Sequence, residues 1–374
     1  MTAKPTLVYF NPDYFSQVDD TVLHYLTKDF HVVWFYLYES LQAKSMRYNP
    51  EKAMDYADKY GITLEVVDPQ MRRRNPKIVM FYYNVAKKIN KYNPDVVYSC
   101  DILFWSVGRF VIRTKYKVFG IHDAKGHETK LTLFGHIIKH LSRSCRRNMD
   151  YFLTFSPNQH DLFKEITKKE SKMVGMSYKS FGVSTKTPPQ INNGVKILFF
   201  GIIGYYKGLD LLIDAIEELN REGVTNLSLT IAGKGDFWKE CQLKIKTPSL
   251  YSLMVRFIQN DEIPDLMSSH HFLVLPYRSA TQSGPLVTAL GYGLPIVAPR
   301  FGCFTEVYSD STAILYQSGD LKNALRKASS LTMADYTQLK NSVMVLKEKY
   351  SEDTIARNYI NAFKEILYGT VSNN

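Results

Sequence analysis

The sequence predicts an α/β protein built from two Rossmann-like domains, each a doubly wound parallel sheet. Short runs of β-branched and aromatic residues alternate with helix-length amphipathic segments along the chain. A stretch rich in Pro, Gly, Ser and Thr, residues 181–194, breaks this alternation near the middle and is typical of a linker. The length of 374 residues is also sufficient for about two domains, each with its own core.

The expected strands fall into two series of six, one on each side of the linker. We therefore divide the chain into an N-terminal domain, residues 1–188, and a C-terminal domain, residues 189–374. The segment from Met333 to Leu367 has a helical pattern without a strand and is a candidate to cross back to the N-terminal domain. The strands of the first series are expected at residues 6–10, 31–38, 62–67, 95–99, 117–123 and 151–156. Those of the second series are expected at residues 196–201, 227–233, 254–259, 271–277, 295–299 and 312–317.

Composition and cysteine spacing exclude several classes of protein. With 45% hydrophobic and 22% charged residues, the chain has the balance of an ordinary globular protein and not of a disordered or fibrous one. The four cysteines stand far apart, with no CxxC pair and no histidine at zinc-ligand spacing, so we expect reduced thiols in a cytoplasmic protein. The N-terminus lacks the features of a signal peptide, and no apolar stretch reaches the roughly 18 uncharged residues of a membrane-spanning helix.

The excess positive charge is confined to the first half of the sequence. Residues 1–187 contain 29 Lys and Arg against 18 Asp and Glu, whereas residues 188–374 contain 18 of each. This asymmetry indicates an anionic partner, namely phospholipid headgroups, a phosphorylated substrate or nucleic acid, although solvated helix faces would give the same pattern. Nucleic acid is disfavoured, because the basic clusters come without an RRM, helix-turn-helix or zinc pattern.

The loop after the strand at 196–201 is a candidate phosphate site. Gly201 and Gly204 allow a tight backbone turn there, and Lys207 stands at the start of the next predicted helix. The amides of a helix N-terminus and a cation both favour an anion. A lysine in the first turn of a helix is, however, usually just solvated, so this loop alone is a weak signal.

A second candidate loop follows the strand at 271–277. Its hydroxyl and amide side chains lead into a short helix, with Pro285 expected at the first helical position and the helix end at Gly291 or Gly293. An ordinary capped turn would have the same sequence. The groups that could hold a diphosphate are Thr281, Gln282, Ser283 and Gly284.

These segments together resemble the retaining glycosyltransferases of the GT-B fold, particularly the family 4 enzymes of bacterial polysaccharide biosynthesis. The resemblance implies two Rossmann-like domains that face each other across a cleft. It covers nearly all of the second half and patches of the first. The segments that carry it are residues 199–216, 229–235, 260–284 and 292–307, and more faintly residues 119–128 and 149–163.

The resemblance also implies a reaction. The chain would move a sugar from a UDP- or GDP-linked donor to a hydroxyl of a glycan acceptor, with retention of the anomeric configuration, as a hexosyltransferase. We expect no cofactor and no metal, because the second half contains no Asp-x-Asp motif. His122 and Lys207 would be the catalytic residues, and Asp123 and His127 would lie on the acceptor side. The implied donor-binding residues are Gly201, Gly204, Lys207, Thr281, Gln282, Ser283, Gly284 and Thr288.

An alternative is a non-catalytic GT-B-like subunit that binds a sugar nucleotide or a partner. Family members carry two glutamates separated by seven residues, and Ala280 and Thr288 stand at those positions here. Turnover of a nucleotide sugar would separate the two possibilities.

A lipid-linked acceptor would place the basic domain at the inner face of the cytoplasmic membrane as a peripheral protein. Apolar neighbours of the basic clusters, such as Met71 and Phe134, could insert shallowly. The basic candidates for this contact are Arg72, Arg73, Arg74, Lys77, Arg143, Arg146 and Arg147.

Overall fold

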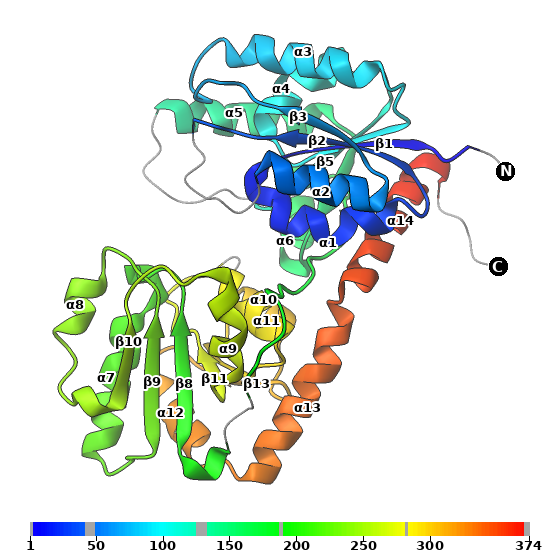
Figure 1. The fold of residues 1–374 in the computed structure, drawn as a ribbon. Coiled ribbons are helices and arrows are strands. Elements are labelled where there is room, and N and C mark those ends of the chain that lie inside the picture. Colours follow the sequence, from blue (N-terminus) through cyan, green and yellow to red (C-terminus); the bar gives the residue numbers. More distant parts are fainter. Residues whose placement is uncertain (1–2, 42–48, 125–132, 187–189, 281–282, 370–374) are drawn as a thin grey trace. The chain divides into compact units, whose positions relative to one another are not determined.

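The computed structural model describes residues 3–41, 49–124, 133–186, 190–280 and 283–369. The chain forms two α/β units, which Figure 1 shows as ribbons. Unit 1 consists of Met1–Ser177 with Glu352–Asn374, and unit 2 of Tyr178–Ser351. The division therefore falls after Ser177 and again after Ser351, whereas the sequence places it between residues 188 and 189.

Unit 1 contains a seven-stranded sheet in which every pairing is parallel. The strand order is β3-β2-β1-β4-β5-β6-β7, so the winding reverses between β1 and β4. The prediction of a doubly wound parallel sheet is confirmed for this unit. The strands are β1 (Thr6–Pro12), β2 (His31–Leu37), β3 (Thr63–Val67), β4 (Val96–Ser99), β5 (Tyr116–Ile121), β6 (Tyr151–Thr154) and β7 (Lys172–Met173).

Helices cover both faces of this sheet, and each face has its own apolar core (Figure 1). One face packs against α1, α2 and α14 through side chains such as Leu23 and Phe363. The other packs against α3, α4 and α5 through side chains such as Val85 and Phe104. The helices of unit 1 are α1 (Ser16–Leu26), α2 (Pro50–Tyr60), α3 (Ile78–Asn90), α4 (Ile102–Val111), α5 (Leu133–Asn148), α6 (Pro157–Thr167) and α14 (Glu352–Tyr368), with the 3-10 turn η1 (Asp13–Phe15).

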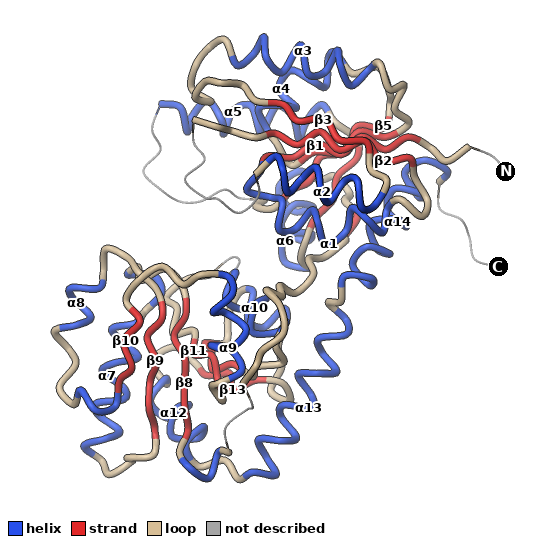
Figure 2. Tube along the Cα trace, viewed as in Figure 1, coloured by secondary structure: helices blue, strands red, loops and turns tan. Residues whose placement is uncertain are grey.

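Unit 2 repeats the same plan with six parallel strands in the order β10-β9-β8-β11-β12-β13. Figure 2 shows strands of this sheet in red and helices in blue. The winding reverses between β8 and β11. The strands are β8 (Val195–Phe200), β9 (Leu227–Ala232), β10 (Tyr251–Met254), β11 (Phe272–Val274), β12 (Ile296–Pro299) and β13 (Ala313–Tyr316). The second doubly wound sheet is thereby confirmed as well.

Two apolar cores flank the second sheet. Helices α7, α8 and α12 pack on one face, and α9, α10, α11 and α13 pack on the other. The helices of unit 2 are α7 (Leu209–Arg221), α8 (Trp238–Gln242), α9 (Ile263–Ser268), α10 (Gly284–Gly291), α11 (Cys303–Val307), α12 (Leu321–Ser329) and α13 (Met333–Lys349). Its 3-10 turns are η2 (Ile191–Asn193), η3 (Tyr205–Lys207), η4 (Pro248–Leu250) and η5 (Asn260–Glu262).

The C-terminal helix α14 belongs to unit 1, although α13 directly before it belongs to unit 2. Its apolar face enters the core of the first sheet, and polar contacts fix it there. Lys364 Nζ lies 2.6 Å from Asp29 Oδ1, and Asn358 donates a hydrogen bond of 3.0 Å to the Val174 carbonyl. Of the segment from Met333 to Leu367, α13 therefore stays with unit 2, and α14 packs with the N-terminal sheet.

Several strands end earlier than the sequence predicts, β11 most of all, and two strands differ in more than their ends. Ser252, Arg256 and Gln259 interrupt the run LYSLMVRFIQ without a regular alternation, so its pattern could not fix the position of the strand, and β10 occupies Tyr251–Met254 and not residues 254–259. The strand ends because the Arg256 amide turns back to the Met254 carbonyl at 2.8 Å. The two-residue strand β7 is too short to produce a pattern of its own.

Candidate functional site

The winding of the second sheet reverses between β8 and β11, and loops at such a point form the usual ligand crevice of an open α/β sheet. Both candidate loops of the sequence start there. One connects β8 to α7 and contains η3, and the other connects β11 to α10. The parallel pairing of β8 with β11 brings the ends of the two strands to the same sheet edge.

Lys207 is the last residue of η3, and its side chain is buried. Its Nζ lies 2.5 Å from Tyr277 Oη and 3.8 Å from the centroid of the Tyr277 ring. Burial lowers the pKa of the Lys207 ammonium to about 8, although the nearby Cys303 thiol acts in the opposite direction. The sequence predicted a cation here, but not that it would be withdrawn from solvent.

The two loops can approach because of Gly208. This residue has φ +68°, and a Cβ placed on it would lie 2.0 Å from the Pro276 carbonyl oxygen. Gly201 also needs a positive φ, of +119°, at the end of β8. Gly204, by contrast, has an extended backbone with φ −122° and precedes η3. Of the predicted turn glycines, Gly201 therefore depends on the lack of a side chain for its backbone conformation.

Ser283 caps α10, and the helix begins at Gly284, one residue before the start at Pro285 that the sequence predicts. Ser283 Oγ accepts a hydrogen bond of 3.4 Å from the Leu286 amide and lies 3.1 Å from Tyr277 Oη. Thr288 is buried in the same helix and donates its hydroxyl proton to the Gly284 carbonyl at 3.0 Å. The other two predicted groups of this loop, at positions 281 and 282, lie outside the described residues.

Arg278 and Asp210 complete this edge and were not singled out from the sequence. The Arg278 guanidinium binds both carboxylate oxygens of Asp210, at 2.8 and 2.7 Å, and donates to the Tyr205 carbonyl at 2.6 Å. The Arg278 amide donates to the Tyr206 carbonyl at 2.8 Å. This ion pair connects two loops that are far apart in the sequence. No spacing of residues along the chain would predict it.

His122 follows β5 in unit 1, as predicted, and its ring lies between two phenylalanines. The ring centroids are 3.9 Å from Phe155 and 4.6 Å from Phe15, with interplanar angles of 12° and 25°. Removal from water lowers the pKa of His122 to about 3, so the imidazole is neutral at physiological pH. His127 lies outside the described residues.

The segment after His122 is fixed by Arg146 of α5. The Arg146 guanidinium donates to the Asp123 carbonyl at 3.0 Å and also to the Ala124 carbonyl. Arg73 likewise pairs with Glu39 and, at 3.0 Å, with Asp101. Both arginines were expected at a membrane surface. That expectation is corrected for these two, because their side chains are committed to internal partners.

Acidic and phenolic groups line the edge where the first sheet reverses. Asp19 is buried and accepts hydrogen bonds from Tyr9 Oη at 2.8 Å and Asn11 Nδ2 at 3.0 Å. Burial raises the pKa of Asp19 to about 8, and those two hydrogen bonds only partly oppose the effect. Asp101 caps α4 by accepting from the amides of Leu103 and Phe104. This edge is polar, and burial disfavours the charged form of Asp19 within it.

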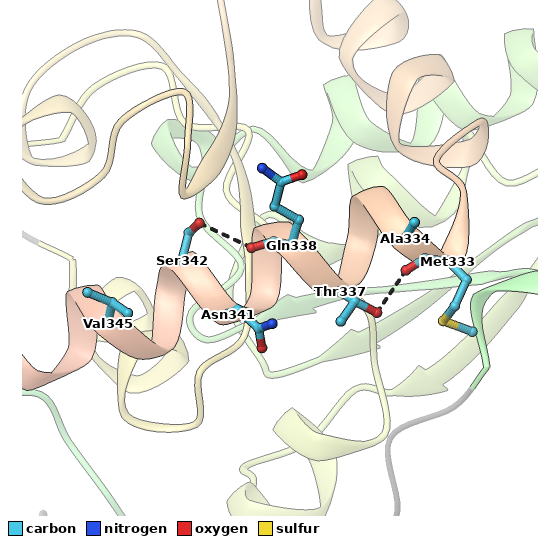
Figure 3. Close-up of a pocket in the computed structure, with 7 residues that line it drawn as sticks. All are labelled: Met333, Ala334, Thr337, Gln338, Asn341, Ser342 and Val345. Atoms are coloured by element: carbon cyan, nitrogen blue, oxygen red, sulfur yellow. Dashed lines mark hydrogen bonds between the residues drawn. The ribbon is translucent and has the colours of Figure 1, made fainter.

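An open depression runs along α13, and none of its lining residues is a predicted site residue (Figure 3). Its threonine and serine hydroxyls donate to helix carbonyls one turn back, at 2.8 and 3.1 Å. Among the described residues, no cluster of three or more His, Cys, Asp or Glu is placed to hold a metal ion. No helix in the described ranges is long and apolar enough to span a bilayer. The depression is lined by Met333, Ala334, Thr337, Gln338, Asn341, Ser342 and Val345.

Residues 194–335 match the family model described as glycosyl transferases group 1. Two curated proteins match shorter stretches. The sulfoquinovosyl transferase SQD2 of Arabidopsis thaliana is 26% identical over 139 residues, which is 36% of this chain and 26% of that protein. The GDP-mannose:glycolipid 4-beta-D-mannosyltransferase of Xanthomonas campestris pv. campestris is 27% identical over 108 residues, or 28% of this chain and 30% of that protein. The aligned part thus spans less than a third of either relative.

Solved structures match nearly the whole chain at low sequence identity. Anabaena HepE in complex with UDP and glucose gives a TM-score of 0.69 at 14% identity, with 96% of this chain and 99% of that chain covered. A glycosyltransferase from Rickettsia africae gives 0.72 at 12% identity, with 98% and 100% covered. WaaG, a glycosyltransferase of lipopolysaccharide biosynthesis, gives 0.63 at 14% identity, with 97% and 100% covered. The chain therefore has the fold of the GT-B glycosyltransferases, and its residues 194–335 carry the sequence pattern of glycosyl transferases group 1.

Proposed function

We propose that this protein is a retaining glycosyltransferase that moves a hexose from a nucleotide diphosphate sugar to a hydroxyl of a lipid-linked glycan acceptor in polysaccharide biosynthesis. The observation that carries the proposal is the buried ammonium of Lys207 beside the N-terminus of α10. It lies at the point where the second sheet reverses its winding, within the segment that matches the family model. The expectation for such a site is an anionic ligand.

A diphosphate suits this site better than a neutral ligand does. Taking an ammonium out of water is unfavourable unless a counter-charge compensates for the lost hydration. Among the ion pairs of the described residues, none involves Lys207, and its hydrogen-bond partner is the phenol of Tyr277. A ligand phosphate would supply the missing charge, while the amides at the start of α10 would bind its oxygens. The solved relative HepE binds UDP, which makes UDP the first nucleotide to test.

In the proposed reaction, the bond between the anomeric carbon and the β-phosphate oxygen breaks while the acceptor oxygen bonds to the same face of the sugar. The proton of the acceptor hydroxyl passes to the departing phosphate oxygen. Lys207 and the α10 amides would stabilise the charge that develops on this oxygen. In this scheme the step needs no metal or cofactor.

Unit 1 would bind the acceptor, with His122, Asp123 and His127 on that side. A neutral imidazole can both donate and accept a hydrogen bond. The lowered pKa of His122 keeps it in this form across the physiological range, so it suits sugar hydroxyls better than phosphates.

The test is a screen of UDP- and GDP-linked sugars for thermal stabilisation and for turnover. A ligand at 100 times its Kd adds about 2.7 kcal/mol to the free energy of unfolding. Stabilisation together with sugar transfer would support the proposal, and absence of both would contradict it. Stabilisation without transfer to any acceptor would favour the non-catalytic subunit, a candidate that the absence of glutamate at Ala280 and Thr288 keeps open.

We also propose that unit 1 docks peripherally on the inner face of the cytoplasmic membrane. After correction for Arg73 and Arg146, the remaining basic candidates are exposed, and each contributes about 1 kcal/mol near an anionic surface. Met71 and Phe134 pack partly against the core, whereas Met80 of α3 and Ile137 of α5 are exposed and better suited to insertion. The exposed basic candidates are Arg72, Arg74, Lys77, Arg143 and Arg147.

Vesicle co-sedimentation at low and high salt tests this docking. Arg72→Glu/Arg74→Glu should lower binding to anionic vesicles, whereas the same charge change at exposed positions of unit 2, Lys239→Glu/Lys349→Glu, should not. Binding of the wild type should also fall as salt shortens the Debye length. Equal loss in both variants, or equal binding to neutral vesicles, would contradict the docking proposal.

A further inference from the structure

Tyr277 connects the two parts of the candidate phosphate site. Its hydroxyl lies 2.5 Å from Lys207 Nζ on one side and 3.1 Å from Ser283 Oγ on the other. The side chain is 4% exposed, so these contacts form in a nearly dry environment. Lys207 comes from η3 and Ser283 from the start of α10, so one phenol bridges the two loops.

The direction of these hydrogen bonds follows from chemistry. An ammonium can only donate, so Tyr277 Oη accepts from Lys207. Burial raises the pKa of Tyr277, so the phenol keeps its own proton and can donate it to Ser283 Oγ. Tyr277 therefore holds the ammonium in place without cancelling its charge. A carboxylate in the same position would cancel it and would compete with an incoming phosphate.

The surroundings of Tyr277 make it a rigid holder. Its ring packs edge-on against Phe304 and Tyr206, with centroid distances of 5.3 and 6.3 Å. The next residue, Arg278, ties the backbone to Tyr206 and pairs with Asp210 in α7. Because the ring and the backbone beside it are both fixed, the hydroxyl of Tyr277 defines where the Lys207 ammonium lies.

We propose that Tyr277 is a positioning residue, which holds the charged ammonium of Lys207 and the capping hydroxyl of Ser283 at the positions where they can bind a diphosphate. This inference rests on the proposed function and extends it to a residue that would act through Lys207. Without the hydroxyl, Lys207 loses its acceptor in a buried place and can point elsewhere. The ligand must then reorder the lysine when it binds, which lowers the affinity.

The test compares Tyr277→Phe with a matched control, Tyr308→Phe. Tyr308 is also buried, packs in the same core as Tyr277, and its hydroxyl has no hydrogen-bond partner among the described residues. Each of the two variants removes one hydroxyl oxygen from the same apolar core. We expect Tyr277→Phe to raise the Kd of UDP about tenfold, as for loss of a hydrogen bond to a charged group, and Tyr308→Phe to leave it unchanged.

A double-mutant cycle with Lys207→Met shows whether Tyr277 acts through the lysine. If it does, adding Tyr277→Phe to Lys207→Met should weaken UDP binding little further. Wild-type UDP affinity in Tyr277→Phe, or full additivity of the two losses, would overturn the inference. A merely structural role would lower stability in Tyr277→Phe without this coupling.

A readout without ligand separates this inference from the proposed function. The titration of Lys207 can be followed by NMR with selectively labelled lysine, assigned from the Lys207→Met spectrum. The titratable groups that contact or face the ammonium are Tyr206, Tyr277 and Cys303. Tyr277→Phe should change the pH at which Lys207 titrates, and Tyr308→Phe should leave it unchanged. If the wild type binds no nucleotide, the proposed function fails, and the titration still decides the positioning role; an unmoved titration would overturn it.

Discussion

Replacing Lys207 with methionine should make the ligand-free protein more stable and should abolish tight nucleotide binding. Met keeps most of the aliphatic stem but removes the ammonium. The pKa of Lys207 is lowered from 10.5 to about 8 in the folded protein. At 1.36 kcal/mol for each pH unit, keeping this group charged at pH 7 costs about 3 kcal/mol of folding free energy. Loss of the hydrogen bond to Tyr277 offsets about 1 kcal/mol, so we expect a net gain of about 2 kcal/mol at pH 7.

The pH dependence of this gain has a definite sign. Because the folded pKa lies below the unfolded one, the unfolded chain binds more protons between about pH 8 and pH 10.5. The wild type therefore becomes more stable, relative to the variant, as the pH rises through this window. The advantage of Lys207→Met should be full at pH 7, should disappear at about pH 10 and should reverse above it, where only the lost hydrogen bond to Tyr277 counts.

Calorimetry of the full chain, with and without UDP, measures both effects. At 100 times the wild-type Kd, UDP should stabilise the wild type by about 2.7 kcal/mol and the variant by almost nothing. Lys239→Met, at an exposed position on α8, is the control and should change neither quantity. A variant that is less stable than the wild type at pH 7, or that UDP still stabilises, would refute the reasoning.

Three further predictions concern pH, metal and the acceptor side. The Kd of UDP should rise about tenfold per pH unit above pH 8, because binding needs the proton on Lys207. Lys207→Arg, which keeps its charge in this range, should remove this dependence. A Kd of the wild type that does not change with pH in isothermal titrations would contradict the role of the lysine. Sugar transfer should be unchanged in excess chelator, whereas loss of activity that a divalent ion restores would contradict the proposed mechanism. His122→Ala should lower kcat more than it weakens UDP binding, and the ratio to wild type should stay constant from pH 5 to pH 8 because the pKa of His122 is about 3. A ratio that changes near pH 6.5 would show that the imidazole titrates normally.

The alternation of strands and helices was sufficient to predict both sheets, because each fully buried parallel strand leaves a short apolar run in the sequence. The prediction of strands was wrong where the sequence pattern does not fix the position of the strand, or where the strand is too short to produce a pattern. The irregular mixture of apolar and polar residues around β10 gave a displaced strand, and the two residues of β7 left no signal at all. The start of α10 was predicted to within one residue, because a proline near the first helical position is a local signal.

The candidate site was only half predictable for a similar reason. Lys207 and Ser283 belong to local patterns, a glycine turn and a helix cap, so the sequence revealed them. Tyr277 contacts Lys207 from 70 residues away, and Arg278 reaches Asp210 across 68. These contacts exist because β8 pairs with β11, and no spacing along the chain encodes that pairing. The burial of Lys207, and hence its lowered pKa, depends on the same tertiary contact.

The charge asymmetry of the sequence acquires a different meaning once the two sheet edges are compared. The half of the chain with the excess of basic residues presents aspartates, tyrosines and a neutral histidine at its reversal point, and Arg73, which reaches this edge, is neutralised by Glu39 and Asp101. The half without net charge presents the buried ammonium of Lys207. Among the described residues, the excess of basic side chains in unit 1 therefore does not supply an unpaired positive charge at the point where the first sheet reverses its winding. Several of these residues are exposed on α5 and before α3, where a charged surface can act on a partner over a Debye length. Fold alone would assign the same ligand to both edges, and under the proposed function it is the side chains that distinguish an edge for an anion from an edge for sugar hydroxyl groups.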